Sequence, residues 1–333
     1  GVGGISGAHI PAWEEIKEVE LVALCDIRQE RLDQYPKKRH YNDFKEMLEK
    51  EDLDILDICL PTYLHADYAI MAMEKGINVI CEKPISLKEE DVERVYSTVK
   101  KNNVKFMIAQ VLRFWPEYEL LKEIFDTEKY GKLLSGTMTR LGCYPKWSWD
   151  GWMMDEKRSG LVPFDLHIHD LDFMVYAFGM PKVAHQFRSK RPEQDFISVS
   201  YDFDGFSINT EASWYATCYP FTAQFRFQFE KAIVANENRT MKIYLEDEEI
   251  DLSKETKGDY ALPLEKVRNN NNTTNNNNVE ENKTMMKLTD EQQAILNGAK
   301  GETMAKVMKT QVMFGEAFGA EKMVPVTSEY NHL

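Results

Sequence analysis

The stretch Val79-Ile80-Cys81-Glu82-Lys83-Pro84 decides the fold of this chain. Residues 79–81 form an apolar run that is too short for a helix, and β-branched residues favour extended structure. Pro84 disfavours the helical region for Lys83, so the chain must leave the strand there in an extended or turn conformation. Ligands of doubly wound sheets bind at the carboxyl ends of the strands. The amine of Lys83 is therefore either a working group at such a site or a solvated surface lysine.

Strands and helices alternate on both sides of this stretch. The predicted strands are residues 20–25, 54–60, 78–81 and 105–110, and the predicted helices are residues 43–50, 65–75 and 88–102. This alternation predicts an α/β domain over residues 1–112, a Rossmann domain with a doubly wound parallel sheet. The strand that normally precedes the glycine turn is missing from the sequence, so we expect this domain to lack its first strand.

The chain opens with a glycine-rich turn. Gly1 and Gly3 fit the first two positions of a dinucleotide fingerprint, and the small residue Ser6 stands at the third. Asp26 ends the next strand, about 20 residues further on, where an acid accepts hydrogen bonds from the adenosine ribose. Asp26 is otherwise a helix cap or a solvated turn residue, but the glycines favour the ribose role. An acid repels a 2′-phosphate, which favours NAD over NADP, although Arg28 lies close enough to accommodate a phosphate.

Three motifs together resemble the Gfo/Idh/MocA family of oxidoreductases: residues 1–5 with His9, Pro61-Thr62 with His65, and Glu82-Lys83-Pro84. The resemblance implies a Rossmann domain joined to a C-terminal α/β domain with a large, open, mostly antiparallel sheet. It implies an NAD(P)-dependent sugar or polyol oxidoreductase in which Lys83 contacts both substrate and nicotinamide ribose. His65 either begins a helix or contacts the cofactor. The residues expected to bind the cofactor are Gly1, Gly3, Gly4, Ile5, Ser6, Asp26, Ile27, Leu60, Pro61, Thr62, His65, Glu82 and Lys83.

Residues 160–179 read as a helix that ends at Gly179. Asp165 and His169 are four residues apart and would share one helical face, where a carboxylate gives an imidazole the defined tautomer that a general base requires. Such a pair is more often structural, but the family has the same D-x-x-x-H pattern. The resemblance thus assigns Lys83, Asp165 and His169 to catalysis. His167 stands between Asp165 and His169, where the family usually has a small residue. A metal site at His167 and His169 is disfavoured, because residues two apart on a helix point in different directions.

The second half, residues 113–333, reads as a substrate-binding and oligomerisation domain. Helix 117–125 is followed by strands at residues 135–141, 197–203, 206–214, 225–229, 232–235 and 240–245. This meander predicts an antiparallel sheet with one open face, through which we expect a homodimer or homotetramer. The asparagine-rich residues 269–278 predict a disordered or low-complexity insertion, and residues 288–297 and 303–318 predict closing helices.

Two features of this half each have two alternative interpretations. The loop at residues 144–152 holds Trp147, Trp149 and Trp152, which form either a hydrophobic cluster under the loop or a platform for the C–H face of a sugar. Arg113 is either a surface ion-pair residue or a functional contact.

The net charge and composition of the chain exclude some classes of partner. The chain of 333 residues carries a net charge of -14 and has no basic stretch, so we expect no nucleic acid and no anionic membrane surface as partners. Its five cysteines form no C-x-x-C pair, and no signal peptide or membrane-length apolar run is present, which predicts a cytoplasmic protein. The alternatives to a sugar or polyol dehydrogenase are NAD-dependent non-redox cleavage of glycosides and a non-catalytic NAD-binding regulatory protein.

Overall fold

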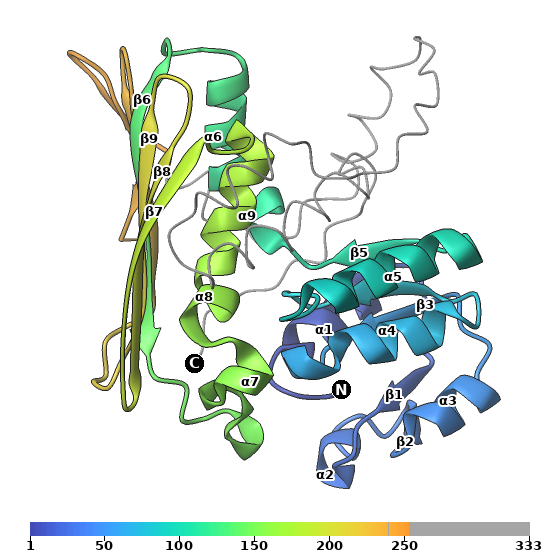
Figure 1. Cartoon of the computed structure of the whole chain (residues 1–333). Coiled ribbons are helices and arrows are strands. Elements are labelled where there is room, and N and C mark those ends of the chain that lie inside the picture. Colours follow the sequence, from blue (N-terminus) through green and yellow to red (C-terminus); the bar gives the residue numbers. More distant parts are fainter. Residues whose placement is uncertain (239, 253–333) are drawn as a thin grey trace, which may run out of the picture.

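The computed structural model describes residues 1–238 and 240–252. It contains an N-terminal half with parallel strands and a second half with one large sheet (Figure 1). Helices α6, α8 and α9 of the second half lie between the large sheet and the N-terminal half in this view. The predicted segments 269–278, 288–297 and 303–318 lie outside the described residues.

The N-terminal half has parallel strands flanked by helices, as the alternation predicts. The strands form two sheets, one of order β1-β2 and one of order β3-β4-β5, and every pair is parallel. No strand among the described residues joins β1 to β3. The strands are β1 (Ala23–Cys25), β2 (Arg39–Tyr41), β3 (Ile55–Ile58), β4 (Asn78–Cys81) and β5 (Phe106–Ile108), and the helices are α1 (Ser6–Glu15), α2 (Gln29–Leu32), α3 (Phe44–Lys50), η1 (Thr62–Leu64), α4 (His65–Met73) and α5 (Glu89–Asn102).

Local chemistry explains where these helices begin and end. The Asp43 carboxylate accepts the Glu46 N–H at the start of α3, which satisfies one of the free donors of a helix N-terminus. Acidic side chains occupy the first turn of α5 and basic ones its last turn, which complements the helix dipole. Asn103 then takes the left-handed conformation that ends α5. Strand β2 was not predicted, because the polar residues of Arg39–Tyr41 give no apolar run.

The second half confirms the predicted large and mostly antiparallel sheet. Its order is β13-β12-β11-β10-β6-β9-β8-β7, and only the β6–β9 pair is parallel. The strands are β6 (Leu133–Cys143), β7 (Val183–Arg191), β8 (Gln194–Asp202), β9 (Ser207–Tyr215), β10 (Thr222–Phe229), β11 (Ile233–Glu237), β12 (Thr240–Tyr244) and β13 (Glu249–Asp251), and the helices are η2 (Val111–Phe114), α6 (Pro116–Asp126), η3 (Trp149–Met154), α7 (Glu156–Ser159), α8 (Leu161–Asp165) and α9 (His167–Phe178). The predicted boundary after residue 112 falls inside η2.

The core of the second half lies on one face of this sheet. Ile197, Val199 and Tyr201 of β8 alternate inward and join a buried cluster with Leu121 of α6 and Leu171 of α9. The alternate residues of β8 are only half-buried, so the opposite face is open, as expected. Serines 198 and 200 stand on that face, and the exposed Phe187 of β7 also lies on it.

The predicted helix over residues 160–179 is wrong in one respect. It is two helices, α8 and α9, which meet at Leu166. The His169 N–H bonds the Leu166 carbonyl three residues back, so the chain tightens at the junction. Asp165 therefore ends α8, while His169 lies in the first turn of α9. Separately, none of the helices in the described part of the chain is long and apolar enough to cross a membrane.

Candidate active site

The glycine turn and Asp26 form one end of the site. The Val2 N–H donates to Asp26 Oδ2 at 2.7 Å, which ties the turn to the end of β1. The Arg28 backbone N–H and Nε donate to Asp26 Oδ1 at 2.9 and 3.2 Å. Burial alone would raise the pKa of Asp26, but these hydrogen bonds and the Arg28 charge outweigh it and lower the pKa. Asp26 is thus held as a carboxylate beside the turn.

The glycines fit a bound dinucleotide. A Cβ at Gly1 would collide with the Cys59 carbonyl, so only glycine fits there. A Cβ at Gly3 or Gly4 would meet no protein atom within 4 Å, so the protein's own packing does not require glycine at these two positions. The open space above them leaves the backbone N–H groups accessible to a pyrophosphate.

A cavity of about 2020 Å³ runs from this turn to the second half of the chain. Asp165 and the tryptophans at 147, 149 and 152 contribute to its wall. Of the predicted cofactor residues, all but His65 line it: Gly1, Gly3, Gly4, Ile5, Ser6, Asp26, Ile27, Leu60, Pro61, Thr62, Glu82 and Lys83.

Lys83, at the end of β4, meets Asp165 across the two halves. Its Nζ donates to the Asp165 carbonyl oxygen at 2.7 Å and to Oδ1 at 3.1 Å. The side chains are only 13% and 11% exposed, so water screens this pair weakly. The structure therefore brings together two of the three residues predicted to be catalytic, and places their charged ends at the cavity wall.

His169 is near enough to Lys83 to be affected by its charge, but it forms no hydrogen bond to Asp165 and is not among the residues that line the cavity. Its Nδ1 is buried without a hydrogen-bond partner, and the Asp165 carboxylate is engaged by Lys83 instead. The predicted Asp165–His169 contact is therefore not formed, because the break at Leu166 removes the continuous helical face. Burial, and then the positive charges of Lys83 and Arg140, lower the pKa of His169 well below 6.5. The imidazole is therefore neutral at pH 7.

Other predicted residues have structural roles. His65 lies between the carbonyl oxygens of Pro84 and Leu60, at 2.6 and 2.7 Å from its ring nitrogens, so it ties two strand-end turns together rather than lining the cavity. His167 is fully buried with Nε2 2.7 Å from the Tyr201 hydroxyl.

Arg113 forms a two-point ion pair with Asp172 of α9, at 2.8 and 2.6 Å. This pair fixes η2 to α9, so Arg113 braces the connection between the two halves. It confirms the ion-pair interpretation of Arg113, although the side chain is mostly buried rather than on the surface.

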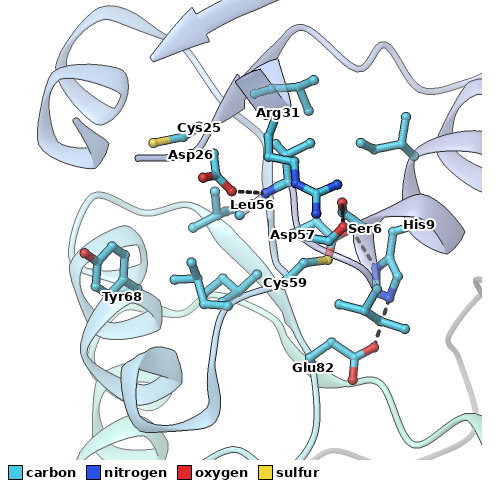
Figure 2. Close-up of a pocket in the computed structure, with 18 of the residues that line it drawn as sticks. Ser6, His9, Cys25, Asp26, Arg31, Leu56, Asp57, Cys59, Tyr68 and Glu82 are labelled. Carbon is cyan, nitrogen blue, oxygen red and sulfur yellow. Dashed lines mark hydrogen bonds and ion pairs between the residues drawn. The ribbon is translucent and has the colours of Figure 1, made fainter. Parts of the chain in front are cut away.

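Figure 2 shows a charged cluster that the sequence analysis did not identify. The ring of His9, from α1, lies between Asp57 Oδ2 at 2.9 Å and Glu82 Oε1 at 3.0 Å. The Trp13 indole also donates to Asp57, at 2.6 Å. The second oxygen of Glu82 accepts the Lys83 backbone N–H at 3.1 Å, so the cluster reaches the strand end that carries the amine. A usable signal was present: Asp57 is a charged residue inside the apolar run of β3, where it needs a partner.

The cluster could also be read as a metal site, since ligand atoms of His9, Asp57 and Cys59 lie within 4.8 Å of one another. Both ring nitrogens of His9, however, face carboxylate oxygens at hydrogen-bond distance, which is the arrangement of a doubly donating imidazolium. Burial alone would lower the pKa of His9, but its hydrogen bonds to Asp57, Cys59 and Glu82 outweigh it and raise the pKa far above 6.5. The imidazolium itself is the cation of this cluster.

Replacing His9 by glutamine is expected to destabilise the protein by about 3–5 kcal/mol, because two largely buried carboxylates lose their cation. The native free energy of unfolding should also fall above pH 6.5, by about 1.4 kcal/mol per pH unit from this group, because unfolded His9 loses its proton there while folded His9 keeps it. Below pH 6.5 both states are protonated and the contribution is complete.

Urea unfolding of the native protein and of His9→Gln at pH 7 and pH 9 measures both effects. The difference between the two proteins should be larger at pH 7. His185→Gln, which changes an exposed histidine of β7, is the control. Equal stability of His9→Gln and native protein at pH 7 would show that no imidazolium is held between the carboxylates.

Models of two domains from one oxidoreductase family match the chain. The model described as "Oxidoreductase family, NAD-binding Rossmann fold" matches residues 1–110, and the model described as "GFO/IDH/MocA C-terminal domain" matches residues 118–235. The two matches follow one another along the chain, and together they cover most of both halves of the described structure.

Curated relatives are similar over part of their length. A 2,7-anhydro-N-acetylneuraminate hydratase of Mediterraneibacter gnavus is 30% identical over 170 residues, which is 48% of this chain and 45% of that protein. A myo-inositol 2-dehydrogenase of Thermotoga maritima is 29% identical over 184 residues, which is 54% of this chain and 53% of that protein. The chain thus spans about half the length of the curated relatives it matches.

Solved structures share the fold over most of the chain. The WlbA dehydrogenase of Bordetella pertussis, in complex with NADH and UDP-GlcNAcA, has a TM-score of 0.69 at 18% identity and covers 94% of this chain and 90% of its own. An oxidoreductase of Agrobacterium radiobacter, in complex with NAD+, L-tartaric acid and magnesium, has a TM-score of 0.69 at 16% identity, over 98% and 96%. At these identities the likeness establishes the fold alone.

Proposed function

This chain belongs to the Gfo/Idh/MocA family of NAD-binding oxidoreductases, and from that premise we propose that it is an NAD-dependent dehydrogenase of a sugar or polyol. The reaction is the oxidation of a secondary alcohol to a ketone, or its reverse. The observation that carries the proposal is the meeting of Lys83 and Asp165 at the wall of the cavity that also holds the glycine turn and Asp26.

The residues of the chain have separate tasks in this reaction. When bound, NAD supplies the acceptor for a hydride from the carbinol carbon. The Lys83 ammonium donates a hydrogen bond to the substrate oxygen in place of one of its bonds to Asp165, and stabilises the negative charge that develops there. The neutral His169 imidazole takes the hydroxyl proton. Asp165 orients the amine, and the buried His9–Glu82 pair holds the backbone of Lys83.

Incubation of the full chain with NAD and a panel of polyols and sugars tests this function. Net formation of reduced nicotinamide with at least one alcohol, followed by absorbance, is the expected result. Calorimetry with NAD alone is the companion measurement. Absence of NAD binding would refute the proposal at its first step, whatever the substrate.

A second candidate function has one observation in its favour: the relative from Mediterraneibacter gnavus, 30% identical, is named a hydratase. A hydratase adds or removes water without net oxidation, so reduced nicotinamide would not accumulate. Product formation with catalytic amounts of NAD and no net absorbance change would therefore favour non-redox chemistry at the same site. Chromogenic glycosides test the corresponding glycoside cleavage.

We expect Asp26→Asn to weaken NAD binding and improve NADP binding, so that the ratio of their dissociation constants changes by about tenfold to a hundredfold. The carboxylate accepts the ribose hydroxyls and repels a 2′-phosphate, and its loss also frees Arg28 to pair with that phosphate. Titration of both cofactors by calorimetry measures the ratio. Asp33→Asn, on an exposed position after α2, should leave it unchanged. An unchanged ratio in Asp26→Asn would show that the acid does not select the cofactor.

Oligomerisation through the open sheet face remains part of the proposal. The exposed Phe187, next to the polar strand β8, is the apolar feature that supports it. Light scattering of the purified chain and of Phe187→Ser tests a homodimer or homotetramer. A cytoplasmic location likewise remains a prediction.

A further inference from the structure

The tryptophan-rich loop of the second half reaches the end of the cavity that Asp26 and Arg28 line. The Trp149 ring lies against the guanidinium of Arg28, with 5.1 Å between Arg28 Cζ and the ring centroid. Arg28 is two residues beyond Asp26, and both Arg28 and Trp149 line the cavity. The contact therefore joins the loop after β1 to η3, 121 residues further along the chain.

The loop is fixed in this position by a second arginine. Arg158 of α7 donates from Nη1 to the Asp150 carboxylate at 2.8 Å and from Nη2 to the Asp150 carbonyl oxygen at 2.7 Å. Helix α7, which carries Arg158, also packs against η1 of the N-terminal half. Asp150 directly follows Trp149, so these bonds hold the indole where it meets Arg28.

The tryptophans of this loop have different surroundings: Trp152 packs against the core of the second half, whereas Trp149 contacts Arg28 at the wall of the cavity. Trp149 is 42% exposed, so it is not the centre of a buried hydrophobic cluster. Its partner Arg28 stands beside Asp26, whereas the amine that would bind a substrate oxygen is at the end of β4. If Asp26 binds the adenosine ribose, a flat aromatic ring at this end of the cavity would meet the adenosine part of a dinucleotide rather than a sugar substrate.

We propose that Trp149 and Arg28 form a clasp for the adenine ring of NAD. The inference rests on the proposed function, because it assumes that Asp26 binds the adenosine ribose. Adenine is bonded to that ribose, so the base lies next to Arg28. An indole face and a guanidinium plane both stack on a purine. The adenine ring takes the place of either the Arg28 guanidinium or the Trp149 indole in their contact. The second half of the chain thereby holds a cofactor that is bound to the N-terminal half.

The clasp predicts that Trp149→Ala weakens the binding of ADP-ribose, which carries adenine but no nicotinamide. Stacking of a base on an aromatic side chain contributes about 1–3 kcal/mol, which corresponds to a roughly 5- to 150-fold rise in the dissociation constant. Trp149→Phe keeps an aromatic face and should recover most of the affinity. Nicotinamide mononucleotide, which lacks adenine, should bind both variants as it binds the native protein.

Calorimetry with the full chain measures these constants. Quenching of tryptophan fluorescence by AMP should also be smaller in Trp149→Phe than in the native protein. Tyr219→Ala is the matched control: Tyr219 is an aromatic residue with the same exposed fraction as Trp149, 42%, but it does not line the cavity. Its affinity for ADP-ribose should change less than twofold.

The outcomes distinguish a failure of the adenine clasp from a failure of the proposed dehydrogenase function. Native protein that binds NAD and ADP-ribose, with Trp149→Ala binding ADP-ribose equally well, overturns the clasp and leaves the dehydrogenase proposal standing. An equal loss in Tyr219→Ala and Trp149→Ala also overturns it, because the effect then follows from loss of any exposed aromatic side chain. Native protein that binds neither NAD nor ADP-ribose overturns both proposals.

Discussion

Replacing Lys83 by methionine is expected to lower kcat about 100- to 1,000-fold. The loss of one preorganised donor to a developing oxyanion has an effect of this size. Methionine keeps an unbranched apolar stem, so the packing at the end of β4 changes little. ADP-ribose, which does not reach the nicotinamide end, should bind the variant as it binds the native protein. Stopped-flow measurement of reduced nicotinamide at saturating substrate gives kcat.

Folding must be separated from catalysis in this experiment. The native amine is the cation that faces the Asp165 carboxylate, which is 11% exposed, so its removal leaves a largely buried charge unpaired. The double variant Lys83→Met with Asp165→Asn removes both charges and should recover thermal stability, yet its turnover should stay low. Lys75→Met, at an exposed position after α4, is the control for loss of a lysine. Native turnover in the double variant would exclude Lys83 from the reaction.

The sequence was informative where one short segment sets both conformation and chemistry. The glycine turn, Asp26 and the strand end at Lys83 were predicted because each follows from a local pattern and from the rule that ligands bind at the carboxyl ends of strands. The structure brings all of them to one cavity. The parallel and antiparallel halves were also predicted, since the spacing of apolar runs separates the two kinds of sheet.

Contacts between distant segments were not predictable in the same way. Lys83 and Asp165 are 82 residues apart, and only the resemblance to a family placed them in one site. The expected contact of Asp165 with His169 failed because a spacing of four residues implies a shared face only on an unbroken helix. Neither glycine nor proline stands at Leu166, and the nearest proline, Pro163, lies in the first turn of α8, where proline is tolerated, so it does not mark the break.

The buried cluster around His9 follows from charged residues that stand in and beside apolar strands. Asp57 and Glu82 follow apolar residues on adjacent strands β3 and β4, and two carboxylates at one sheet edge need a cation. His9, on the first helix after the glycine turn, is that cation. The role of Trp149 was missed for a different reason: an aromatic loop pattern does not tell which end of a cleft the loop will cover.

Replacing His169 by asparagine is expected to lower kcat about 100- to 10,000-fold and to leave the affinity for NAD nearly unchanged. A positioned base contributes this much, and asparagine keeps a polar side chain that cannot accept a proton at neutral pH. Initial rates at saturating cofactor measure the loss, with His185→Asn on the exposed strand β7 as control. Equal turnover in His169→Asn and native protein would remove His169 from the mechanism.

The pH dependence of kcat/KM tests the same residue independently. Burial and the charges of Lys83 and Arg140 lower the pKa of His169, and a base works only when it is unprotonated. The native enzyme should therefore stay active below pH 6.5 and lose activity only well below it. In Lys83→Met one of the positive charges is gone, so the pKa of His169 rises and the acid limb of the residual activity should move towards pH 6.5. An acid limb that stays in place would show that the amine and the imidazole do not act on one another, and hence not on one bound alcohol.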